Sequence, residues 1–355
     1  MSSLETLDKI IQLPQSIANL TLTMPDFSSK LEEVLTLLYL LKEFSPPHGG
    51  FLIKQFSMLL PYAIQGDKIP RQMLDKFVHH YVESVRNILK PFLVGFFTEA
   101  IYCYIKKSLS NPDILEKLIS SKNCKSLAEE LFKELESEYI ELSKRISQQI
   151  SHNKCVISSM FGPSTLCRLL ADVYFYYITA EENSDALILN IGRFFESLLL
   201  YLLAPMKALE VIRENLKSQH SISSKELAKK ISGVFKDFER KTLGKLIPLM
   251  KKKDKNGETL LDVISKNKIW LGELLNEILV YYNKVKHPKP FSLPLDPRIS
   301  RSITLRLISA LDEELVEAFF EYLSRNFDIP INSKKIREEI LEKSYEILHI
   351  IFKNY

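Results

Sequence analysis

The sequence predicts an all-α protein, a multi-helix bundle divided into two helical domains. Only 10 of its 355 residues are glycine, and alternating runs of β-branched residues are scarce. Apolar residues instead recur every three or four positions, which is the spacing of one helix face. Because the chain is longer than one hydrophobic core usually accommodates, we expect two helical domains or one elongated array.

Helix starts and ends are marked along most of the chain. Capping boxes open helices at Ser29 and Ser223, and Asn111–Pro112 marks another start. The segment SPPHGG (45–50) and Pro91 are expected to end helices. Helices are therefore expected over about 30–44, 51–64, 70–90, from 112, and over 125–150, 165–180, 185–203, 205–218, 223–240, 270–287, 300–325 and 332–353.

The best candidate for a domain boundary is the polar, Gly- and Pro-bearing segment 151–164. It predicts an N-terminal helical domain over 1–155, whose role the sequence does not indicate. A helical bundle over 165–325 and a C-terminal helix over 332–355 follow. The segment 288–298 contains four prolines, so we expect it to be a non-helical connection.

Composition is typical of a soluble globular protein, with 46% hydrophobic and 26% charged residues. The stretches 91–105 and 194–206 are strongly apolar, but each contains a glutamate. Each is also shorter than the roughly 20 residues that a membrane span needs. We therefore expect buried core helices and no membrane association. The N-terminus lacks the pattern of a secretory signal, which predicts a cytoplasmic protein.

The sequence predicts no metal site and no cofactor. Its four cysteines show no CxxC spacing and fit a reducing compartment: Cys103, Cys124, Cys155 and Cys167. His79 and Glu83 stand four residues apart, but no third ligand is apparent, so a solvated helix face is expected. His48 is expected to be an exposed loop histidine.

Positive charge is concentrated in one region. The formal net charge is only +4, yet residues 213–258 hold 13 Lys and Arg against 6 Asp and Glu. A solvated, charged loop is one interpretation of this excess, and a surface that attracts phosphate is the other. For the second interpretation, the candidate RNA-binding residues are Lys251, Lys252, Lys253 and, further along, Lys286.

A polar row ends the helix predicted over 270–287. The apolar stripe of this helix comprises Leu271, Leu274, Leu275, Ile278, Tyr282 and Val285. A second row runs beside it and comprises Asn276, Val280, Asn283 and His287. Pro288 disfavours helical geometry at His287, so the helix should end there. A histidine in that place suits proton transfer and equally suits a plain helix cap.

These segments resemble the HEPN superfamily of helical domains. The resemblance rests on WLGELLNEILVYYNKVKH (270–287), preceded by KTLGKLIPLM (241–250) and IGRFFESLLLYLL (191–203), and covers about 185–325. Members carry an Arg, usually an Asn, and a His on one helix. Many are metal-independent ribonucleases of prokaryotic stress and defence systems, commonly with the site at a dimer interface. Others are inactive and serve in dimerisation or nucleotide binding.

The family motif carries over only in part. Asn283 matches its polar position and His287 its histidine, but Tyr282 stands where the arginine is expected. The resemblance implies that His287 would deprotonate the ribose 2′-hydroxyl and that Asn283 would orient the phosphate or the histidine. Lys284 or Arg193 would supply the fixed positive charge that a tyrosine lacks.

Three functions follow from these observations. A HEPN-like protein, degenerate in catalysis, would associate with RNA or nucleotide in a prokaryotic stress or defence system. An active metal-independent endoribonuclease would use His287. A non-catalytic interaction or scaffold protein would hold a protein partner through the basic 213–258 region or an apolar face. The resemblance by itself also implies a homodimer.

Overall fold

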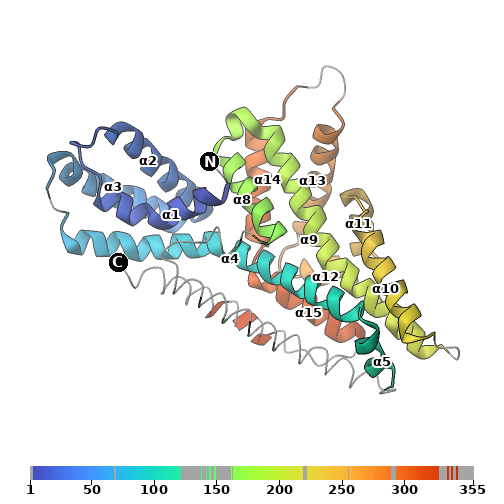
Figure 1. Cartoon of the computed structure of the whole chain (residues 1–355). Coiled ribbons are helices and arrows are strands. Elements are labelled where there is room, and N and C mark those ends of the chain that lie inside the picture. Colours follow the sequence, from blue (N-terminus) through green and yellow to red (C-terminus); the bar gives the residue numbers. More distant parts are fainter. Residues whose placement is uncertain are drawn as a thin grey trace.

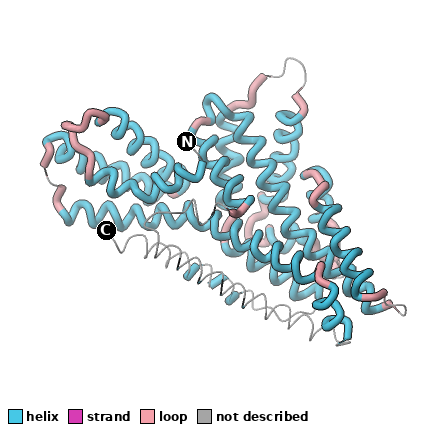
Figure 2. The backbone as a smooth tube through the Cα atoms, viewed as in Figure 1, coloured by secondary structure: helices cyan, strands magenta, loops and turns pink. Residues whose placement is uncertain are grey.

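Figure 1 shows the computed structural model, an elongated array of helices. The structure describes residues 3–120 without 68, then 163–218, 222–254, 256–288 and 293–327, and a few isolated positions between 137 and 161 and between 334 and 342. Within these residues all named elements are helices, joined mostly by short loops (Figure 2). The all-α prediction is confirmed.

The helices pack on one another in layers around two long members. They are α1 (Ser3–Ala18), α2 (Phe27–Phe44), α3 (Pro46–Gln65), α4 (Arg71–Leu109), α5 (Pro112–Ser120), α8 (Thr165–Ile178), α9 (Ala180–Lys217), α10 (Ser224–Phe238), α11 (Leu243–Met250), α12 (Leu260–Ile264), α13 (Leu271–Lys286), α14 (Pro297–Ala310) and α15 (Glu313–Phe327).

The long helices α4 and α9 hold the others together. They contain 39 and 38 residues. The length of α4 corresponds to roughly 58 Å along its axis, and α9 has a kink at Asn183, where the backbone is not helical. α4 begins beside α2 and α3 and ends beside α5 and α10, while α9 crosses the bundle beside α8, α13, α11 and α10 (Figure 1). Most of the smaller helices therefore pack on one of these two, whereas α12 packs chiefly on α15.

The structure differs from the predicted helix boundaries in four places, one of which is a break at Leu311–Asp312 that divides the helix expected over 300–325 into α14 and α15. α4 continues through Pro91, and α9 continues through Pro205, where a break at about 203–205 was expected. A proline removes one backbone hydrogen bond, but both prolines are buried and flanked by buried apolar residues, whose packing holds each helix together. The segment 45–50 is not a loop, because Pro46 occupies the first turn of α3, where proline is tolerated.

The core is continuous across the chain. One cluster of buried apolar side chains extends from Ile10 to Leu323, and α8 packs against α1, α4 and α9. The division into domains 1–155 and 165–325 stays a prediction, because most of the expected boundary lies outside the described residues. The same holds for the helices expected over 125–150 and 332–353.

The apolar stretches 91–105 and 194–206 lie in this core, as predicted. The helices that contain them, α4 and α9, are long and apolar enough to cross a membrane by length and composition alone. In the structure, 67% and 61% of their most apolar windows are buried against other parts of the protein. Such burial is what the core helices of a bundle require.

A carboxylate on α4 positions α8. Glu99 accepts hydrogen bonds from the Ser164 hydroxyl at 2.6 Å and from the N–H groups of Thr165 and Leu166 at 3.1 and 3.0 Å. These N–H groups have no partner within their own helix, and the helix dipole favours a negative charge there. The start of α8 is therefore fixed against the middle of α4.

The helices α9 and α13 approach each other closely at Gly192. A Cβ atom on Gly192 of α9 would lie 2.1, 2.5 and 2.6 Å from three ring atoms of Tyr282. Tyr282 itself is only 4% exposed. A residue without a side chain at 192 is what allows this aromatic ring to lie flat against α9.

We expect Gly192→Ala to lower the free energy of unfolding by about 1–3 kcal/mol, because the new methyl group would overlap the Tyr282 ring. Denaturant unfolding followed by circular dichroism measures this. Gly233→Ala in α10 is the matched control, since a Cβ there meets nothing within 4 Å. That variant should gain about 0.5–1 kcal/mol from helix propensity. Equal effects of the two substitutions would contradict the packing described.

Candidate functional site

The polar row predicted on 270–287 is exposed along α13. Its members Asn276, Val280, Asn283 and His287 are all exposed, whereas the apolar stripe of the helix faces the core. His287 is the C-cap of α13, and its N–H donates to the Asn283 carbonyl oxygen at 3.0 Å. The predicted helix end at this histidine is confirmed, and both candidate side chains are open to solvent.

Tyr282 is a core residue at the position where the family motif has arginine. Its ring packs on Gly192, and the Lys286 ammonium group lies 3.3 Å from its hydroxyl oxygen and 5.0 Å from its ring centroid. An arginine here would place its charge against the buried side of α9, which is energetically costly without a partner. Positive charge is therefore held at the outer end of the Tyr282 side chain, by Lys286.

The two residues expected to replace the missing arginine are not in contact with the histidine. Lys284 and Arg193 are both exposed, and no hydrogen bond links either of them to His287 in the part of the chain that is described. Glu196, one turn after Arg193, instead accepts a hydrogen bond from the Leu243 N–H at 2.9 Å. This carboxylate fixes the start of α11 against α9.

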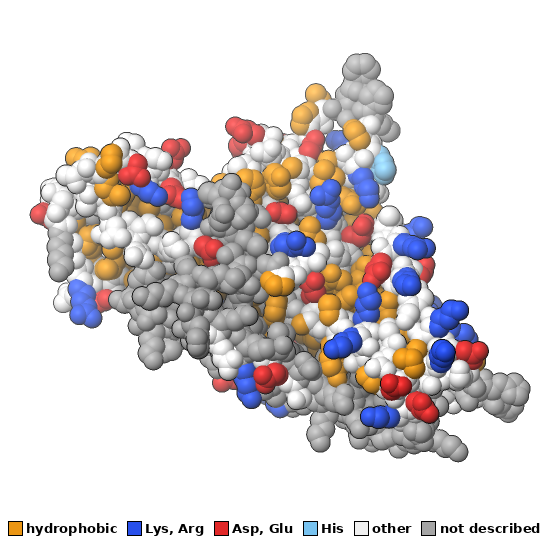
Figure 3. Space-filling view, in the orientation of Figure 1, with side chains coloured by type: hydrophobic (Ala, Val, Ile, Leu, Met, Phe, Trp, Pro, Cys, Tyr) orange, Lys and Arg blue, Asp and Glu red, His pale blue; other side chains and the backbone are white. Residues whose placement is uncertain are grey.

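The lysine run after α11 adjoins the polar row of α13. Lys251 donates to the Asn276 side-chain oxygen at 3.2 Å, which joins the run to α13. We call the combined area the α11–α13 surface; it consists of Lys251, Lys252, Lys253, Asn276, Asn283, Lys284, Lys286 and His287. Figure 3 shows Lys and Arg side chains gathered over the side formed by α13, α11 and α10.

The five lysines of this surface form no ion pair with any carboxylate among the described residues. Other lysines of the bundle are paired, such as Lys207 with Glu210 at 2.8 Å and Lys241 with Asp237, although exposed lysines on α10 such as Lys229 and Lys230 are not, within the described part of the chain. Of the two acidic side chains of α13, Glu273 is exposed near the opposite end of the helix, and Glu277 forms an ion pair with Arg306. The α11–α13 surface is therefore free to attract an anion.

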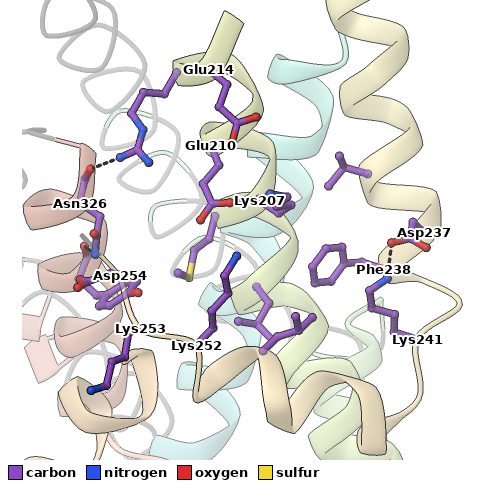
Figure 4. Close-up of a pocket in the computed structure, with 16 residues that line it drawn as sticks. Lys207, Glu210, Glu214, Asp237, Phe238, Lys241, Lys252, Lys253, Asp254 and Asn326 are labelled. Carbon is purple, nitrogen blue, oxygen red and sulfur yellow. Dashed lines mark hydrogen bonds and ion pairs between the residues drawn. The ribbon is translucent and has the colours of Figure 1, made fainter. Parts of the chain in front are cut away.

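A cleft of about 540 Å³ adjoins the same lysine run. It lies between α9, α10, α15 and the turn after α11, and Figure 4 shows its side chains. The apolar part of its lining is Leu203, Met206, Val234, Phe238, Leu249 and Tyr322. The charged part is Lys207, Glu210, Arg213, Glu214, Asp237, Lys241, Lys252, Lys253 and Asp254. Cations and carboxylates are nearly balanced in the charged part. Because the lining has both an apolar and a charged part, the cleft is amphipathic.

Two adjacent lysines at the edge of the cleft, Lys252 and Lys253, extend in different directions. Lys252 extends into the cleft, whereas Lys253 extends away from it (Figure 4). Arg213, on the opposite wall, donates to the Asn326 carbonyl oxygen at 3.0 Å. Sequence reasoning missed this cleft because α9, α10 and α15 meet only in the folded chain. The available indication was a group of charges, from Lys207 to Glu214, on an otherwise apolar helix.

Asp254 organises the turn at the edge of the cleft. Its Oδ1 atom accepts hydrogen bonds from the N–H groups of Asn256 at 2.7 Å and Glu258 at 3.0 Å, and Gly257 takes a left-handed conformation (φ 80°). Burial by itself raises the pKa of Asp254, but hydrogen bonds from the Asn326 side chain and from this backbone lower it overall. The folded turn therefore favours the carboxylate form.

We expect Asp254→Asn to destabilise the protein at neutral pH, and the difference from wild type to shrink on acidification. Because the folded-state pKa of Asp254 is lowered, its contribution is present above the unfolded pKa and is lost as the pH falls through the folded value. Denaturant unfolding at about pH 7 and at about pH 3 measures this. Glu273→Gln removes an exposed carboxylate and should show no such difference. A gap that is constant with pH would contradict the assignment.

No family model, curated protein or solved structure matches this chain. The resemblance to the HEPN superfamily stays a prediction, which rests on the residues of α9, α11 and α13 described above.

Proposed function

We propose that this protein is a HEPN-like helical protein that binds RNA or a nucleotide through the α11–α13 surface and that is degenerate in catalysis. The observation that carries the proposal is the set of five lysines without carboxylate partners, beside exposed asparagine and histidine side chains. The position in a prokaryotic stress or defence system, and the homodimer, rest on the resemblance alone.

The chemistry of this surface suits a phosphate-bearing ligand. A lysine that is already paired with a carboxylate must lose that partner before it can bind a phosphate. These five lysines have no such partner to lose among the described residues. Binding of their ammonium groups to phosphates would release counterions, which gives an affinity that falls with salt. The exposed amides of Asn276 and Asn283 can donate to or accept from sugar and base edges. Single-stranded RNA offers all of these groups at once.

The absence of catalysis follows from the place of Tyr282. Stabilising the charge on a phosphate in the transition state needs a cation held in a fixed position. The residue at 282 is neutral and buried, and the candidates Lys284 and Arg193 are exposed, with no hydrogen bond to His287. A histidine alone can move a proton, but here it lacks the preorganised charge beside it.

We expect Lys251→Gln/Lys284→Gln/Lys286→Gln to weaken binding of a fluorescently labelled single-stranded RNA. If all three contact phosphates, the slope of log affinity against log salt should fall by about 2, since each contact to a single strand contributes about 0.7. Fluorescence anisotropy at several salt concentrations measures this slope.

The matched control is Lys54→Gln/Lys76→Gln/Lys107→Gln, which removes the same charge from exposed, unpaired lysines on α3 and α4. It should keep the wild-type slope. If both triple variants lose the same affinity, binding follows net charge alone and the proposed surface is wrong.

We expect no cleavage of mixed RNA by the purified protein in EDTA, and the same result for His287→Ala. Gel analysis of 5′-labelled RNA after incubation measures this. Cleavage by the wild type that is lost in His287→Ala would replace the proposal with the metal-independent endoribonuclease.

The interaction or scaffold protein is favoured by one separate observation. Val280, in the middle of the polar row, is 63% exposed, and Ile269 and Leu293 are 89% and 82% exposed. Exposed apolar side chains of this size suit a protein partner. If wild-type protein shows no affinity for RNA or nucleotide at low salt, this alternative takes the place of the proposal.

A further inference from the structure

Two histidines face each other between α3 and α4, far along the chain from the α11–α13 surface. His48 lies in the first turn of α3 and His80 near the start of α4, and both are half-buried. The prediction that His48 is an exposed loop residue is therefore wrong, because Pro46 starts a helix there. His79, which the sequence paired with Glu83, is exposed instead.

The distance between the two imidazoles suits a shared metal ion. The Nδ1 atoms of His48 and His80 lie 3.5 Å apart, which is long for a hydrogen bond between ring nitrogens. Two histidine nitrogens bound to one tetrahedral zinc ion at 2.0–2.1 Å are separated by about 3.3–3.4 Å. The observed distance therefore needs almost no movement of either helix to accommodate the ion.

The two rings are held in place by the packing around them. The Asn87 amide donates to the Ser45 hydroxyl at 2.9 Å, which ties the start of α3 to α4 beside the histidines. The Phe51 ring packs on His80 with centroids 3.9 Å apart. A Cβ on Gly49 would lie 2.3 Å from the Lys42 backbone, so α3 is also pressed closely against α2. The pair is preorganised before any ion binds.

The electrostatic environment favours the form of histidine that binds metals. Burial, with the neighbouring His79 and His48, lowers the pKa of His80. A metal ligand must be the neutral imidazole, and the direction of this shift is compatible with that form. The nearby acidic group on the same helix, Glu83, is in an ion pair with Arg86 at 3.0 Å.

We propose that His48 and His80 form a binding site for a divalent transition metal ion, preferentially zinc, that links α3 to α4. No group of three or more His, Cys, Asp or Glu side chains suited to a metal occurs among the described residues. Water therefore completes the coordination. With two protein ligands the affinity is modest, and the bound ion keeps open positions. The site is independent of the proposed RNA-binding function.

Calorimetric titration of the EDTA-treated, full-length protein with zinc chloride tests this site. The chain has seven histidines. The zinc affinities of the variants are therefore compared with one another, and complete loss of zinc binding is not expected. We expect His48→Ala and His80→Ala each to weaken one equivalent of zinc by about tenfold or more, because each removes a direct ligand. His79→Ala is the matched control and should bind as wild type does.

Thermal unfolding gives a second readout. Zinc should raise the midpoint of the wild type and of His79→Ala, and should raise that of His48→Ala less, because a ligand that binds only the folded state stabilises it. His48 lies in an accessible first turn, so its variant decides the matter if His80→Ala does not fold. Wild-type protein that binds no zinc, or His48→Ala that binds it as wild type does, would overturn the proposal.

Discussion

The contact between Gly192 and the ring of Tyr282 is the constraint on which the arrangement of the bundle depends. It brings α13 against α9, and α9 is also the surface on which α8, α10, α11 and α14 pack. The same contact orients α13: with position 282 turned inward, the row from Asn276 to His287 must face solvent. The packing of the core and the exposure of the candidate site therefore have one cause.

Periodicity and capping predicted much of this structure. The start of α10 at Ser223 and of α5 after Asn111 are as expected, and so is the end of α13 at His287. These features are local, because each depends on side chains within one turn. The Ser29 capping box was misplaced by a few residues, since α2 begins at Phe27. Local patterns locate a helix better than they locate its ends.

What the sequence could not predict depends on distant contacts. Pro91 and Pro205 lie inside helices because neighbouring helices bury them. A pattern of adjacent residues cannot indicate this burial. The same is true of the cleft beside Lys252 and of the pair formed by His48 and His80, which are 32 residues apart in the chain. Of the candidate site, the exposed row and the inward position of Tyr282 were predictable from the periodicity, whereas the close contact of its ring with Gly192 was not.

The carboxylate that holds α8 also bears on the order in which the chain is made. Glu99 on α4 leaves the ribosome well before its three hydrogen-bond donors at 164–166. Until those residues and α8 emerge, the face of α4 that packs against α8 has no cover, because the ring of Phe92 stacks on Tyr174 of α8 in the folded protein. The nascent chain thus carries an open apolar helix face from the emergence of Glu99 to that of residues 164–166, a stage at which such surfaces are prone to aggregation.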